Sequence, residues 1–122
     1  MKYVLAIQVN REVLESLSES ERQAFEDAHR RLQADTQASG ELLSTHPLGD
    51  PTHTTVVRSV AGQRTVTDGP YVEMKEYLGG YYLFDVDSRD RAVELAGRLP
   101  EANIDGLAVE VRPVMYSLGA DL

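Results

Sequence analysis

The spacing of apolar residues predicts two strands that are apolar on both faces. Residues 3–9 read YVLAIQV and residues 80–86 read GYYLFDV. In the first segment Tyr3, Leu5, Ile7 and Val9 point to one side, and Val4 and Ala6 point to the other. A strand with two apolar faces is normally covered on both sides, so both segments are expected in the interior of a larger assembly.

A long amphipathic helix is predicted between the first strand and Gly40. Asn10 caps a short helical turn over Arg11–Leu17, and the capping box Ser18–Glu21 then opens the main helix. This helix is expected to run to about Ala38 and to end at Gly40. Residues at helical spacing along it form the expected buried stripe: Ala24, Phe25, Ala28 and Leu32.

A second helix is predicted after residues 80–86. Asp87 or Ser88 is expected to cap it and Pro100 to close it. A final strand over Leu107–Tyr116 alternates apolar and charged residues. The core side of the helix is expected to hold Ala92, Val93, Leu95, Ala96 and Leu99.

The remaining segments complete an α+β order. Residues 41–45 are a strand candidate, and residues 46–53 form a loop broken by prolines and a glycine. Residues 54–60 and 63–67 predict a hairpin that turns at Ala61-Gly62. Without this inserted β-hairpin the order is β-α-β-β-α-β, which predicts a ferredoxin-like, four-stranded antiparallel sheet with both helices on one face.

This fold class and the two-sided strands together predict a homodimer. Two helices cover only one face of a sheet, and an exposed apolar face of that size is unusual for a monomer. A second copy related by two-fold symmetry is the simplest cover.

Composition and charge narrow the class of protein. The 122 residues are expected to form one domain over residues 1–122. A net charge of −8 disfavours nucleic acid as a partner, and no segment reaches membrane-spanning length. The absence of cysteine and of a signal peptide favours a cytoplasmic location. No metal or organic cofactor is expected, because His46, Asp50 and His53 lie on a loop that sets no metal geometry and no cofactor motif is present.

The loop Thr67–Glu76 is the main candidate for chemistry. Asp68-Gly69-Pro70 has a plain explanation as a turn, and its functional interpretation is that the turn aims Asp68 into a pocket. Lys75 is placed to attract an anionic ligand group. Gly79-Gly80 allows close approach, either of a ligand or of the neighbouring strand, and the strand is favoured.

Several segments together resemble the YCII-related family, in its DGPF-type branch. They are TDGPYVEMKEYLGGYYLFDVDS at residues 67–88, VEVRPVM at 109–115, the opening MKYVLAI, and the hairpin VVRSVAGQRTVTDGP. Tyr71 stands where the branch usually has Phe. The resemblance implies a dimeric α/β-barrel fold. Some relatives look like small lyases or dehalogenases with a His–Asp acid–base pair, and others are labelled regulators.

His29 matches the place of the family's proposed histidine, because it lies on the main helix eleven residues before Gly40. The acidic partner is expected soon after that glycine, but residues 41–45 contain no Asp. The pair is therefore incomplete, and Asp68 and Glu41 are the candidates to complete it. A boundary histidine such as His29 also has an ordinary structural or solvated interpretation.

Two functions remain open from the sequence. The first is a cofactor-independent lyase or isomerase, in which His29 or His46 moves a proton with Asp68. A small polar or aromatic metabolite would lie in a pocket with the ligand-binding residues His46, Tyr71, Lys75 and Tyr82 around it. The second is a non-enzymatic module that binds a ligand or a partner protein, in one version linked to transcriptional regulation.

Overall fold

The structure is a computed structural model and describes residues 1–71 and 74–119. Val72 and Glu73 of the predicted loop lie outside the described residues. The elements in chain order are β1 (Lys2–Asn10), α1 (Arg11–Glu15), α2 (Glu19–Ser39), β2 (Leu42–Pro47), the 3₁₀ turn η1 (Pro51–His53), β3 (Thr55–Val60), β4 (Gln63–Asp68), β5 (Glu76–Asp85), α3 (Arg89–Gly97), the 3₁₀ turn η2 (Pro100–Ala102) and β6 (Ala108–Pro113).

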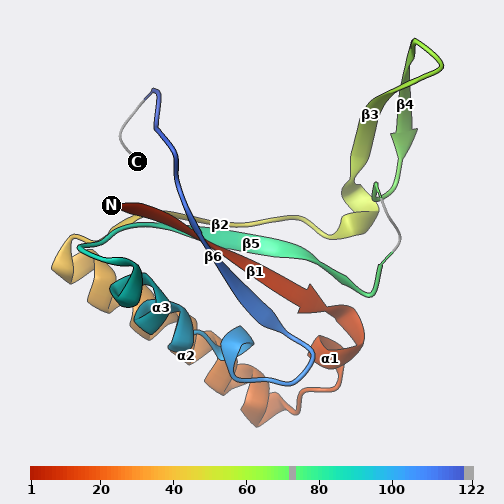
Figure 1. Ribbon diagram of the computed structural model, residues 1–122. Helices are drawn as coiled ribbons and strands as arrows, with labels where there is room; N and C mark the ends of the chain where they lie inside the picture. The colour runs from red at the N-terminus through yellow and green to blue at the C-terminus, as the bar shows by residue number, and fades with distance from the viewer. Residues whose placement is uncertain (72–73, 120–122) are drawn as a thin grey trace.

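Four strands form an antiparallel sheet in the order β2-β5-β1-β6, and β3 and β4 form a separate two-stranded sheet. Figure 1 shows α2 and α3 side by side on the same face of the larger sheet. This arrangement confirms the predicted α+β, ferredoxin-like sheet with an inserted hairpin. No described helix within residues 1–71 and 74–119 is both long and apolar enough to cross a membrane.

The core lies between the sheet and the two helices. Alternate residues of β1 are buried on the helix side, and Val4 and Ala6 between them are half-buried on the other side. Each buried aliphatic side chain contributes about 1.5–3 kcal/mol to folding through removal of apolar surface from water. The largest fully buried side chains are Tyr82, Phe84, Leu5, Leu32, Leu95, Leu99 and Thr36.

The predicted helix stripes are partly wrong. Ala24 is exposed near the start of α2, and Val93 is 43% exposed on α3. Thr36 is buried instead, because its hydroxyl donates to the Leu32 carbonyl at 2.7 Å and so satisfies its polar group within the helix. Helical spacing alone does not show how far the sheet extends beneath each turn.

Local signals set the helix ends. Ser18 and Glu21 form the predicted capping box, and Gly40 ends α2 in the left-handed conformation with φ 79°. Ser88 caps α3 through the amide of Arg91. The helix stops at Gly97 rather than at Pro100, because proline holds the preceding residue extended.

The strand predicted from Gly80 begins earlier, at Glu76. Gly79 is the extra residue of a bulge, since Ile7 pairs with Gly80 and Gln8 pairs with Leu78. A Cβ at Gly79 would come within 2.9 Å of the Val9 side chain. The neighbouring strand therefore accounts for this glycine, as the sequence favoured. The final strand is shorter than predicted and ends at Pro113.

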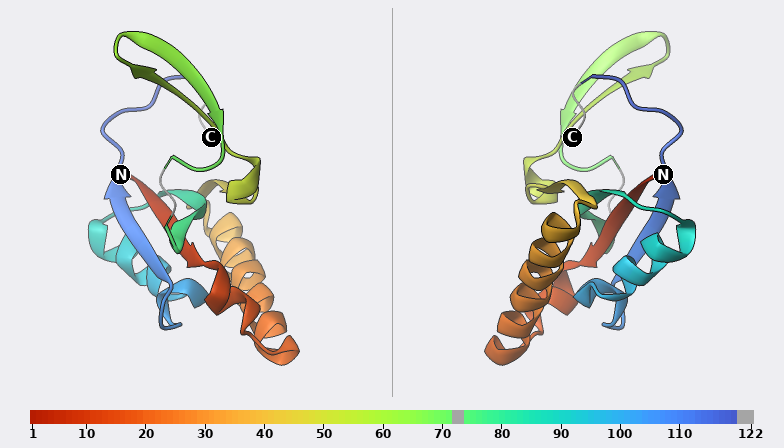
Figure 2. Two further views of the ribbon diagram at one scale, coloured as in Figure 1. Left: turned by 90° about the vertical axis from the view of Figure 1, so that its right-hand side faces the viewer. Right: turned by 90° about the vertical axis from the view of Figure 1, so that its left-hand side faces the viewer.

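The hairpin of β3 and β4 projects away from the larger sheet (Figures 1 and 2). Ala61 and Gly62 form its turn with φ 50° and 79°, the left-handed geometry of a tight hairpin. At the base, the Gly69 amide donates to the Thr54 carbonyl at 2.8 Å. Asp68, the last residue of β4, pairs with Thr55 and therefore lies at the base of the hairpin.

Candidate functional site

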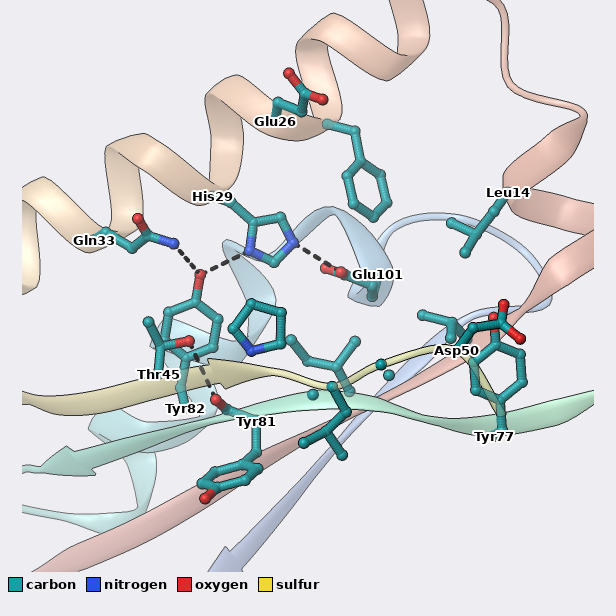
Figure 3. A pocket seen from close by; sticks show the side chains of 18 of the residues that line it. Leu14, Glu26, His29, Gln33, Thr45, Asp50, Tyr77, Tyr81, Tyr82 and Glu101 are labelled. Atoms are coloured by element: carbon teal, nitrogen blue, oxygen red, sulfur yellow. Dashed lines mark hydrogen bonds and ion pairs between the residues drawn. The ribbon is translucent and has the colours of Figure 1, made fainter. Parts of the chain in front are cut away.

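A cleft of about 740 Å³ lies between α2 and the helix-facing side of the sheet. Its sheet side includes Ile7 and Val9 of β1, and the segment after β2 closes one end with Leu48 and Asp50. Tyr77 and Leu14 lie at the same end as Asp50 (Figure 3). The volume is in the range of small-molecule sites, and the wall is mainly apolar with a few polar groups.

His29 of α2 extends from the helix toward the sheet and forms the polar centre of the cleft (Figure 3). Its Nδ1 lies 2.7 Å from the Tyr82 hydroxyl, and its Nε2 lies 2.7 Å from Oε2 of Glu101. The imidazole also packs in parallel with the Tyr82 ring, with centroids 5.9 Å apart. With the His29 side chain only 19% exposed, these contacts fix its orientation.

The hydrogen bonds around His29 have a consistent direction. An ionised carboxylate only accepts, so the Nε2–H of His29 donates to Glu101. In the neutral ring Nδ1 then accepts from the Tyr82 hydroxyl, which in turn accepts from the Gln33 amide at 3.0 Å. Burial raises the pKa of Tyr82, so its hydroxyl keeps its proton at neutral pH.

Glu101 is the acidic partner that the sequence did not reveal. It is 3% exposed, and its second oxygen, Oε1, is buried with no hydrogen-bond donor among residues 1–71 and 74–119. Pro100 opens the turn η2 that carries it, and the Asn103 side chain fastens this turn to the carbonyls of Gly97 and Leu99. The sequence around Glu101 resembles an ordinary polar connection and gave no signal, since 72 positions separate it from His29.

The structure brings His29 and Tyr82 together but places His46 elsewhere. His46 pairs with Tyr81 across β2 and β5, and their rings lie 5.2 Å apart. Side chains alternate along a strand, so the neighbours Thr45 and Pro47 line the cleft while His46 points to the other face. His46 therefore does not meet His29, and Glu41 is bound by Arg91 at 2.8 Å, outside the cleft.

Asp68, Tyr71 and Lys75 also lie away from the cleft. All three are exposed, and none of them lines the wall that holds His29. Tyr71 borders a second cleft of about 570 Å³ with His53, and Arg58 lies over its ring at 5.9 Å. The catalytic role expected for Asp68 and the ligand-binding roles expected for Tyr71 and Lys75 stay predictions.

His46, Asp50 and His53 do not form a metal-binding cluster in the described part of the chain. No three His, Asp or Glu side chains among residues 1–71 and 74–119 gather closely enough to hold a metal ion. Asp50 instead caps η1 and binds Arg11 through both oxygens, at 2.6 and 2.7 Å. The Thr52 amide and the Arg11 guanidinium lower the pKa of Asp50 to about 2.

Comparison with known proteins identifies the family. The YCII-related domain matches residues 1–116, so the chain belongs to the YCII-related family. An uncharacterized protein of Rhizobium meliloti (strain 1021) is 39% identical over 82 residues. The matched region spans 66% of this chain and 66% of that relative.

Proposed function

We propose that the protein binds a small organic molecule in the His29 cleft and moves a proton on it, as a cofactor-independent lyase or isomerase does. The observation that carries the proposal is the placement of His29 between Glu101 and Tyr82 in the wall of a cleft of ligand size. Glu101 takes the role for which Asp68 and Glu41 were the sequence candidates.

The His29–Glu101 pair has the chemistry of an oriented base. A buried carboxylate that accepts from Nε2–H holds one tautomer and stabilises the imidazolium that forms when the ring gains a proton. A substrate proton would move to Nδ1 as the substrate replaces the Tyr82 hydroxyl at that atom. The same proton would return to a neighbouring substrate atom in an isomerisation, or to the leaving group in an elimination.

A non-enzymatic ligand-binding module is the second candidate. It is favoured by the occupation of both His29 nitrogens, because a ring engaged on both sides also serves as a rigid part of a binding wall. In that case the contacts of Tyr82 and Gln33 would only shape the cleft.

Hydrogen–deuterium exchange separates these two candidates. Carbonyl metabolites with an acidic C–H would be incubated with the protein in D₂O and followed by NMR. Exchange that is lost in His29→Gln and kept in His53→Gln would support proton transfer. Ligand-induced shifts of the Tyr82 signals without exchange would support the non-enzymatic binding module. The absence of both shifts and exchange with every such metabolite would contradict both candidate functions.

The same proposal includes a homodimer of the dimeric α/β-barrel type and a place in the DGPF-type branch. Its support is the sheet face opposite the helices, where Val4, Ala6, Tyr81 and Leu83 are half-buried and Leu78 is 43% exposed. A second copy would cover these residues. Light scattering at micromolar concentration is expected to give twice the chain mass, and a monomer there would refute the dimer.

A further inference from the structure

The charges around the cleft are unevenly distributed. Asp50 and Glu101 contribute carboxylates to its wall, and Glu26 lies at its edge with the carboxylate pointing away from the sheet (Figure 3). Within the described part of the chain, Arg30 is the one Arg or Lys side chain on that wall. The immediate surroundings of a ligand are therefore acidic, as is the whole chain with its net charge of −8.

The basic groups near the cleft are already held by acids. Arg30 lies 3.8 Å from carboxylate oxygens of both Glu26 and Asp27, so this trio keeps one net negative charge. Arg11, next to the cleft, binds both oxygens of Asp50 and neutralises it. An anionic ligand would have to displace one of these contacts to find a cation.

Glu101 adds a buried negative charge to the inner wall. One of its oxygens accepts from His29, and no residue in the described part of the chain donates to Oε1. A carboxylate that is only half satisfied and shielded from water acts on its neighbours more strongly than one at the surface. Its field reaches the cleft through the wall that it shares with His29.

Aromatic rings line the same cleft. Phe25 packs against His29 with ring centroids 5.3 Å apart, and Tyr77 stands at the opposite end beside Asp50 (Figure 3). The face of an aromatic ring attracts a cation and repels an anion, because its quadrupole is negative there. The apolar walls of Ile7 and Val9 suit the hydrocarbon part of the same ligand.

We propose that the cleft selects a small organic cation, an ammonium group carried on an aromatic or aliphatic body, over an anion of the same shape. This inference rests on the proposed ligand cleft and names the class of ligand that it takes. The carboxylates supply the attraction for the charge, and the rings and aliphatic side chains cover the body.

Three isosteric probes test the inference: benzylammonium, benzyl alcohol and benzoate. Each is titrated to millimolar concentration at low salt, with the NMR signals of the His29 and Tyr82 rings as the readout. Benzylammonium is expected to bind at least about tenfold more tightly than benzoate, a difference of about 1.4 kcal/mol, with benzyl alcohol between them. Added salt should narrow the gap, because it screens the charges.

A matched pair of variants assigns the effect to the cleft. Glu101→Gln removes the inner charge and should reduce the preference for benzylammonium. Glu19→Gln removes the same charge from the exposed first turn of α2, outside the cleft, and should leave the preference unchanged. Equal effects of the two variants would attribute selection to net charge and overturn the role of the cleft.

The remaining outcomes separate this inference from the proposed function. Benzoate binding at the His29 and Tyr82 signals as tightly as benzylammonium would overturn the cation preference while leaving the ligand cleft in place. The absence of a shift with all three probes would overturn both the cation preference and the proposed ligand cleft.

Discussion

Replacing His29 with leucine would leave the most buried carboxylate of the site without its hydrogen bond. Glu101 is 3% exposed and accepts a hydrogen bond from His29 at 2.7 Å, and no described residue donates to its Oε1. Removing the hydrogen-bond donor of a buried carboxylate costs about 3–5 kcal/mol, as when one partner of a buried ion pair is removed, because the carboxylate charge stays buried. His29 borders the cleft and its side chain is 19% exposed, so we expect the lower end, about 3 kcal/mol.

A double-mutant cycle isolates this interaction from the loss of packing. Glu101→Met alone leaves the His29 N–H unpaired beside the cleft, which costs about 1 kcal/mol. The double variant replaces the pair by two apolar side chains of similar size. Its free energy of unfolding should fall by no more than that of Glu101→Met alone. The interaction energy is then about 3 kcal/mol.

Urea unfolding followed by circular dichroism at neutral pH gives the four free energies of unfolding. Each kcal/mol should correspond to about 4 °C in Tm for a domain of this length. A cycle of His53→Leu with Glu19→Met, which changes two exposed residues on separate elements, should be additive. Additivity of the His29 and Glu101 changes within about 0.5 kcal/mol would refute the pair.

Three further outcomes are expected. Gly80→Ala places a Cβ 2.8 Å from the His46 carbonyl oxygen and should cost about 1–3 kcal/mol in urea unfolding, whereas Gly97→Ala meets no atom within 4 Å and should not destabilise. Tyr82→Phe removes the hydroxyl that contacts His29 and Gln33, and should lower Tm by an amount corresponding to about 1–2 kcal/mol. The Arg91 guanidinium lowers the pKa of Glu41 from 4.5 to about 2, so the stability from this pair is present above pH 4.5 and is lost as the pH falls toward 2. Urea unfolding measured across that pH range should show that acidification lowers the free energy of unfolding less in Glu41→Gln than in the unchanged protein. An equal decrease would contradict the stabilising role of the Glu41–Arg91 pair.

The sequence by itself determined the elements whose signals are local. Alternation in residues 3–9 gave β1 and its buried face, and the capping box at Ser18 and the glycine at position 40 gave both ends of α2. Ala61-Gly62 gave the hairpin turn. Each signal acts through neighbours in the chain, since hydrogen bonds at a cap or a turn join residues only a few positions apart.

The candidate site was only partly accessible from the sequence. His29 and Tyr82 were both named as site residues, and the structure joins them at 2.7 Å. His46 lies outside the His29 cleft because a single step along a strand moves a side chain to the opposite face. Asp68 lies at the base of the hairpin and also outside the cleft, because no local pattern encodes how the hairpin joins the larger sheet.

Glu101 shows what only the tertiary structure decided. Its contact with His29 requires α2 to pack next to the turn η2. It also requires Pro100, which stops α3 and opens this turn. The burial of its carboxylate follows from packing among elements that are distant in the chain. Strand alternation and helix caps depend on covalent neighbours, whereas a site built from α2, β5 and η2 depends on how those elements pack, which a single sequence does not display.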